Sequence, residues 1–226
     1  MRLLCNDVDL LRREPGLLRE CRVVASRLVS LPTTYTGVSG AVSALVFNGD
    51  TPVRPGNVAW IEQRSRAFAV IGLGEQIIQV AAVTNQMPDD PTNDVPELEA
   101  GPGDGGVTTE VWTFPQISWA SRRVLARLDL RSLTTAGQFD AEALREVAAL
   151  FALAAVFRSM SALDRTLVND NFGRGVSFSQ SWRLHGEWYE RAADRELRRL
   201  KLAVDANLDG RAEAERAPGV PGLMRV

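Results

Sequence analysis

The sequence predicts an α+β protein, mainly α, with a helical bundle built from both chain ends and a small antiparallel β-sheet or barrel inserted between them. Two observations predict this class. Apolar residues recur at helical spacing near the N-terminus and again through the second half of the chain. Between these regions, β-rich runs alternate with turns of glycine, proline and asparagine.

Helices are expected over residues 1–34, which we assign to the bundle. Asn6 or Asp7 can cap a first turn, and Pro15 suits the first position of a second helix. Apolar residues then recur at helical spacing as far as Leu28, before a proline ends the segment.

Residues 35–114 are the predicted β insertion. The runs TYTGVSGAVSALVF, PVRPGNVAWIEQ, RAFAVIGL and EQIIQVAAVT are separated by turn residues, and VTTEVWTF is expected to be a returning strand. Inside the insertion lies the acidic segment 86–106, QMPDDPTNDVPELEAGPGDGG, which is expected to be a long surface loop. Its residues Asp89, Asp90 and Asp94 are therefore expected to be solvated, and not to act as paired catalytic carboxylates.

Residues 115–204 are predicted to be helical again. The helix that contains AALFALAAVF, residues 148–157, is apolar on nearly every side and should be the most buried one. Asp140 is its expected N-cap. A last helix is predicted from about Ser177 to Val204, and residues 205–226 follow as a turn and a C-terminal docking arm.

Composition argues against several classes of partner. The 226-residue chain is 45% hydrophobic and 24% charged, with a formal net charge of -2, so bulk charge attracts it to neither nucleic acid nor anionic membrane. The apolar run 148–157 is too short to span a bilayer, and the N-terminus lacks the apolar core of a signal peptide. Cys5 and Cys21 are expected to be reduced thiols in a cytoplasmic protein without a membrane partner.

The stretch DANLDGRAEAER begins like the calcium loop of an EF-hand. Asp205, Asn207 and Asp209 supply oxygens at alternate positions, and Gly210 follows them. Position 12 is Arg216, a cation where such a loop needs a bidentate carboxylate. We therefore favour a helix end followed by a tight turn, and keep Asp205, Asn207 and Asp209 as weak candidates for a cation site.

The sequence contains no recognisable catalytic motif. His185 is the only histidine, and it is expected to be a packed or half-exposed residue of a helix. The pieces IGLGEQ and GPGDGG lack the context of a phosphate-binding loop. Neither enzymatic activity nor a cofactor is therefore expected.

Tryptophan and arginine mark the first candidate interface positions. Trp188 lies off the apolar stripe of the last predicted helix, and Trp119 lies off its own stripe beside Arg122 and Arg123. Tryptophan next to arginine is the composition of interface anchors. The alternative is a tryptophan that only covers part of the surface.

Five segments, taken in order, resemble those of one class of structural protein. They are NDVDLLRREPGLL, VRPGNVAWIE, TFPQISWASRRVLARL, FDAEALREVAALFALAAVFRSM and WYERAADRELRRLKLAVDANLDGRAEAER. Their order and spacing resemble the head-tail connector (adaptor) proteins of tailed bacteriophages and gene transfer agents. The resemblance covers nearly the full chain, and the unusually long acidic segment 86–106 departs from it.

The resemblance implies a virion structural protein without catalysis. Such adaptors form a ring of twelve copies that joins the portal of the DNA-filled capsid to the tail and encloses DNA without sequence-specific binding. The implied partners are further copies of the chain, the portal protein and a tail or stopper protein. The implied location is the head-tail interface of the virion, after synthesis in the host cytoplasm.

Side-by-side helix packing in such a ring adds Arg191 and Arg195 to the interface candidates, and the docking arm adds Leu223 and Met224. Two alternatives to the adaptor role stay open. One is a tail terminator or stopper, and the other is a weak calcium-dependent binding module.

Overall fold

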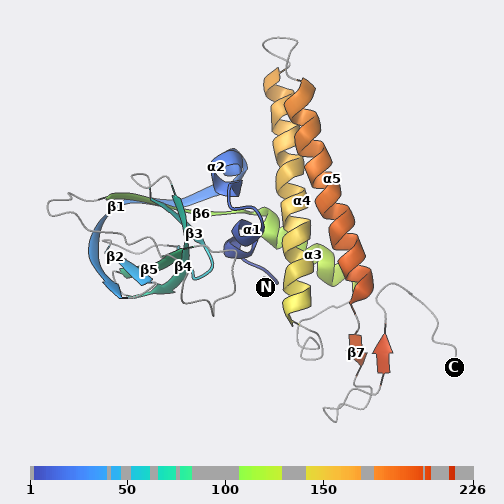
Figure 1. The fold of residues 1–226 in the computed structure, drawn as a ribbon, viewed down its shortest axis with the longest axis horizontal. Coiled ribbons are helices and arrows are strands. Elements are labelled where there is room, and N and C mark those ends of the chain that lie inside the picture. The colour runs from blue at the N-terminus through green and yellow to red at the C-terminus, as the bar shows by residue number, and fades with distance from the viewer. Residues whose placement is uncertain are drawn as a thin grey trace. The chain divides into compact units, whose positions relative to one another are not determined.

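The computed structural model describes residues 3–39, 42–46, 52–61, 66–74, 77–82, 107–128, 141–168, 176–200, 202–204 and 214–216 (Figure 1). The chain divides into two compact units. The barrel unit contains Asn6–Pro115, and the helical unit contains Met1–Cys5 together with Gln116–Val226. Helices and antiparallel strands occupy separate stretches of the chain, which confirms the predicted α+β class.

The barrel unit is a closed barrel of antiparallel strands in the order β1-β2-β5-β4-β3-β6. The strands are β1 (Ser26–Ser39), β2 (Val42–Val46), β3 (Val58–Ile61), β4 (Arg66–Leu73), β5 (Ile77–Ala82) and β6 (Val107–Thr113). Closure joins the first strand to the last, with Ser26 opposite Thr113 and Thr33 opposite Val107. Buried apolar side chains from β3, β4, β5 and β6 form one core cluster.

The start of the barrel corrects the predicted N-terminal helices. Helix α2 (Leu17–Cys21) and the 3-10 turn η1 (Arg22–Val24) end before β1 begins at Ser26, so the helix predicted through Leu28 is wrong. The reason is long-range pairing, because β1 is held by β6 and Leu28 packs against the barrel core. Helices α1 (Asp7–Arg13) and α2 also fall within the barrel unit, and not with the later helices as assigned from the sequence.

Helix α1 starts with a capping box and a buried carboxylate. The Asn6 side chain accepts a hydrogen bond from the Asp9 N–H (3.1 Å), and the Asp9 carboxylate accepts one from the Asn6 N–H (2.8 Å). The Asp7 carboxylate accepts hydrogen bonds from the Phe114 N–H (2.7 Å), at the end of β6, and from the Asn57 amide (2.9 Å). Burial raises the pKa of Asp7 to about 6, although both hydrogen bonds act to lower it.

The turn that meets α1 requires a glycine. Gly56 has φ +93°, and a Cβ there would lie 2.9 Å from the Cβ of Asn6. Its carbonyl accepts a hydrogen bond from the Val8 N–H (3.3 Å), and its N–H donates to the Val70 carbonyl (2.8 Å). The stretch RPGN, residues 54–57, therefore forms a turn that fastens α1 to β4.

An arginine and two tryptophans link η1 to the barrel wall. The Arg22 guanidinium lies 4.7 Å from the ring centre of Trp60 on β3 and 5.3 Å from that of Trp112 on β6. Glu110 completes the group, because it lies 3.6 Å from Arg22 and accepts hydrogen bonds from Arg27 (2.9 Å) and from the Trp112 indole (3.2 Å). Both tryptophans therefore have a role within this unit.

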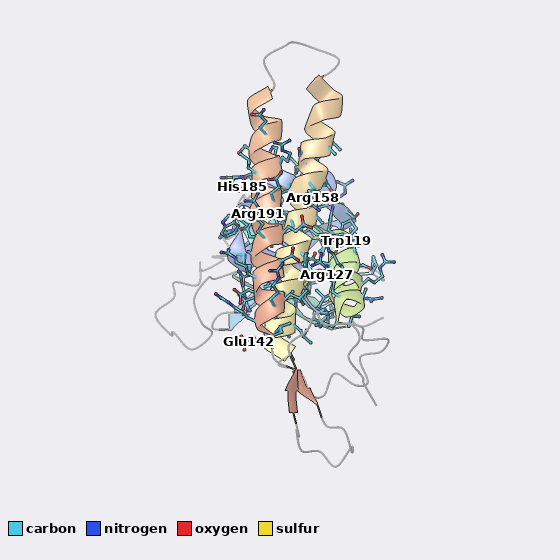
Figure 2. The ribbon with its side chains drawn as sticks, turned by 90° about the vertical axis from the view of Figure 1, so that its right-hand side faces the viewer. Trp119, Arg127, Glu142, Arg158, His185 and Arg191 are labelled. Atoms are coloured by element: carbon cyan, nitrogen blue, oxygen red, sulfur yellow. The ribbon has the colours of Figure 1, made fainter. Side chains whose placement is uncertain are left out.

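The helical unit consists of α3 (Gln116–Arg127), α4 (Ala141–Val168) and α5 (Val176–Arg199), followed by the paired strands β7 (Leu202–Val204) and β8 (Ala214–Arg216). Both α3 and α5 pack against α4 (Figures 1 and 2). Every residue from 147 to 154 is buried, which confirms that α4 is a core helix. The prediction for the last helix is too long, because α5 stops at Arg199 and the chain then forms β7.

Helix α4 also has the length and composition of a membrane span over Ala141–Leu163. The sequence expectation considered only the shorter run 148–157, and the helix around that run is longer. In the structure 61% of its most apolar window is buried, which is the pattern of a helix covered by its own fold. Length and composition are therefore weak evidence for a membrane here.

Gly186 allows α4 and α5 to approach closely. A Cβ at this position would lie 3.2 Å from the Ala154 carbonyl oxygen and 3.2 Å from the Cγ of Arg158. Glycine is a poor helix former, so its place in the middle of α5 is explained by this contact. Next to it, Phe157 of α4 stacks with Trp182 and Tyr189 of α5, with ring centres 5.6 Å apart in each case.

We expect Gly186→Leu to destabilise the helical unit by about 1–3 kcal/mol, because the added side chain has to push α5 away from α4. Ser181→Leu is the matched control, since Ser181 is exposed on the same helix. Urea unfolding of both variants measures the effect. Equal stabilities for the two leucine variants would contradict close packing at Gly186.

The buried Asp7 predicts a pH-dependent stability. Its ordinary pKa is 3.8 and its folded pKa is about 6, so between these values the folded protein holds a proton that the unfolded chain has lost. Stability should therefore fall by about 2–3 kcal/mol as the pH rises through this window, and stay low above pH ~6.

We expect Asp7→Asn to remove this pH dependence, because the amide cannot ionise. The measurement is the free energy of unfolding of wild type and variant at several pH values from about 4 to 7. The difference between the two should move in favour of the variant as the pH rises, whereas parallel pH profiles would count against a buried, titrating Asp7.

Candidate interaction surface

Arginine–carboxylate pairs hold the three helices of the helical unit together. Arg123 of α3 donates a hydrogen bond to Glu190 of α5 (2.6 Å), and Arg158 of α4 pairs with the other oxygen of Glu190. Arg127 of α3 pairs with Asp194 of α5 at 2.5 Å. Glu190 therefore connects α5 to both of its neighbours (Figure 2 labels Arg127 and Arg158).

Arg123 is committed to this internal network. Its guanidinium lies 5.0 Å from the ring centre of Trp119 and 4.7 Å from that of the buried Phe151. Burial, together with the neighbouring Arg127, lowers the pKa of Arg123, while Asp194 acts to raise it. The Arg123 guanidinium is therefore used inside the helical unit, which makes it a poor interface candidate. Trp119 beside it is 40% exposed, and Arg122 is exposed.

The opposite side of α5 carries an exposed row of residues that we call the outer stripe. It consists of Leu184, Trp188, Arg191, Arg195 and Arg198. These positions follow one another in alternating steps of four and three residues, so they share one face of the helix. The residues that face α4, among them Gly186, Tyr189 and Ala193, lie on the other face of the helix and are buried.

Large apolar groups are exposed at one end of the outer stripe. Leu184 is 58% exposed and Trp188 is 56% exposed. The Trp188 ring is held edge-on against Tyr189, with ring centres 4.7 Å apart. An exposed indole that is held in place by a buried ring is well suited to anchor a partner.

Cationic groups fill the other end of the outer stripe. Arg191 pairs with Glu187 at 3.1 Å. Arg195 and Arg198 have no ion pair among the residues that the structure describes. A hollow of about 460 Å³ lies along this face, lined by Trp188, Arg191, Asp194, Arg195 and Arg198. It is an open, mostly cationic surface next to an indole.

Two of the eight sequence candidates, Leu223 and Met224, lie outside the described residues, as does the expected N-cap Asp140. The other six lie on α3 and α5, and Trp188, Arg191 and Arg195 come together on the outer stripe. Sequence reasoning missed Leu184 and Arg198. The signal was available, because they continue the four-three spacing set by Trp188, Arg191 and Arg195.

His185 lies beside the outer stripe and is exposed on α5 (Figure 2). Its Nδ1–H donates a hydrogen bond to the Ser181 carbonyl (3.0 Å), and its ring lies 5.5 Å from that of Phe157. These contacts are those of an ordinary helix histidine, as expected.

The described residues contain no group of three His, Cys, Asp or Glu side chains that could hold a metal ion. Cys5 and Cys21 are both buried and outside any disulfide, and burial raises the pKa of the Cys21 thiol to about 12. This thiol is therefore protonated at neutral pH and unreactive.

The weak cation candidates Asp205, Asn207 and Asp209 lie outside the described residues. Their flanks are described, and Leu202–Val204 pairs antiparallel with Ala214–Arg216. Helices flank the loop of an EF-hand, whereas strands flank this one. Arg216, at position 12 of the compared loop, lies in β8 opposite Leu202.

Comparison with family models, with curated proteins and with solved structures returns no match for this chain.

We expect Glu190→Gln to destabilise the helical unit by about 1–3 kcal/mol, because two arginines lose their shared carboxylate. Glu190 is 19% exposed and Arg123 is 22% exposed, so solvent screens this network only in part. The matched control is Glu196→Gln, since Glu196 pairs with the 74% exposed Arg199 on the same helix. We expect that control to change stability by less than about 0.5 kcal/mol in urea unfolding, and equal losses in both variants would contradict a special role for Glu190.

Proposed function

We propose that this chain is a structural subunit of a head-tail connector (adaptor) ring. The ring joins the portal of a DNA-filled capsid to the tail and has no catalytic role. The observation that carries the proposal is the outer stripe of α5, which offers an anchored tryptophan and arginines to a neighbouring molecule. The resemblance of the segment order to adaptor proteins gives this surface its assembly context.

The geometry of the helical unit suits a subunit of a ring. Helices α4 (28 residues) and α5 (24 residues) lie side by side, and the network of Arg123, Arg158 and Glu190 fixes them to each other. A face held in this way presents its residues with little loss of conformational freedom on binding. In the assembled ring, twelve copies would pack side by side.

The proposed partners are other copies of the chain, the portal protein, and a tail or stopper protein. The protein acts at the head-tail interface of the virion after synthesis in the host cytoplasm. It encloses DNA without reading its sequence, which agrees with a formal net charge of -2, because a strongly basic channel would retain DNA that has to move. The proposal includes neither a cofactor nor a membrane.

Two other roles remain as second candidates. A tail terminator or stopper would use the same kind of helical face, since it too docks on neighbouring subunits. A weak calcium-dependent module would use Asp205, Asn207 and Asp209, and the strands that flank them give it less support than helices would.

The test is quantitative mass spectrometry of purified particles. We expect this chain at about one copy per portal subunit, because adjoining rings with matched symmetry contain equal numbers of subunits. Labelled antibody then tests whether the chain lies next to the portal, as the adaptor role requires. Absence of the chain from particles would contradict every one of these virion roles.

A further inference from the structure

We propose that the outer stripe of α5 binds the acidic, proline-rich segment 86–106 of a second copy of this chain. The proposal rests on the proposed function, because it names the contact that would join neighbouring subunits of the ring. It is head-to-tail, since the stripe and the segment are different parts of the chain.

Charge is the first argument for this occupant. Arg195 and Arg198 have no carboxylate partner among the described residues, and Arg191 has only its helix neighbour Glu187. The segment 86–106 contains six carboxylates and no lysine, arginine or histidine. Guanidinium groups form their strongest hydrogen bonds with carboxylates, so the unused donors of one surface match the acceptors of the other.

The apolar end of the stripe is the second argument. Leu184 and Trp188 expose apolar surface, and the segment also contains Val95, Leu98 and four prolines. Proline-rich chains dock on exposed aromatic rings because they are already extended and lose little entropy on binding. The tryptophan-to-arginine order along α5 therefore fits a ligand that is both proline-rich and acidic.

Charge repulsion counts against the simplest alternative, in which the stripe pairs in parallel with the same stripe of another copy. A symmetric contact with the two helices parallel would set Arg191, Arg195 and Arg198 against arginines of the partner. The stripe also faces away from the side of α5 that packs on α4, so it is presented outward from the helical unit. A head-to-tail contact with an acidic segment avoids the repulsion and repeats around a ring.

Sedimentation of the full-length protein tests the proposal. We expect self-association in the micromolar range at about 50 mM salt, weakening as the salt is raised, because opposite charges are screened. The stripe variant, Arg195→Glu with Arg198→Glu, and the segment variant, Asp89→Lys with Asp90→Lys, should each associate at least roughly tenfold more weakly. The control, Arg12→Glu with Arg19→Glu, makes the same charge change at exposed positions of the barrel unit and should stay within about twofold of wild type.

A mixture of the two variants identifies the pairing. The stripe variant keeps an intact segment and the segment variant keeps an intact stripe, so the mixture should associate with nearly wild-type affinity although neither variant does so alone. A mixture that stays monomeric would show that an intact stripe and an intact segment do not pair between copies, and would overturn the proposal.

Two further results would also overturn it. One is a wild-type protein that stays monomeric up to about 100 µM at low salt, where micromolar association would be complete. The other is a stripe variant that weakens association while the segment variant does not, since a different partner surface would then occupy the stripe. None of these results changes the outcome of mass spectrometry on purified particles. Failure of this proposal is therefore distinguishable from failure of the proposed function.

Discussion

The helical unit is organised by one constraint, which is that α4 has no polar side to expose along its centre. Residues 147–154 are buried in succession, so neighbouring elements must cover the helix all round. Helix α5 meets this demand with glycine, alanines and aromatic rings on one face. Because that face packs against α4, the residues half a turn away around α5 face outward. These outward-facing residues are the outer stripe.

The same constraint decides which arginines remain available. Arg123, Arg127 and Arg158 come from helices that border the apolar core, and there they pair with Glu190 or Asp194. Arg123 and Arg127 also lie over the ring of Phe151. Arg195 and Arg198 lie on the outer stripe, where neither forms an ion pair with a described carboxylate, although Asp194 lines the same hollow. The position of each arginine around its helix therefore decides whether its guanidinium pairs inside the unit or is exposed to a partner.

Much of the fold could be predicted from local patterns, and the errors have physical causes. Turn residues predicted the strands, because glycine and proline disfavour regular structure wherever the chain reverses. The helix ending at Cys21 was extended to Leu28 since a strand can continue a helical spacing by chance, and only pairing with β6 far along the chain reveals it. Likewise, nothing local showed that α5 stops at Arg199 so that β7 can pair with β8.

The candidate surface was predicted only in part for a related reason. Tryptophan beside arginine is visible in sequence, but whether a side chain is free depends on partners from other helices. Trp60 and Trp112 are held by Arg22, whereas Trp188 remains 56% exposed. The barrel adds a restriction of its own, because closure leaves its strands β1 to β6 without a free edge for a neighbour to extend. Contacts made by that unit must therefore use side chains or connecting segments, and the contact proposed above would use the acidic segment 86–106.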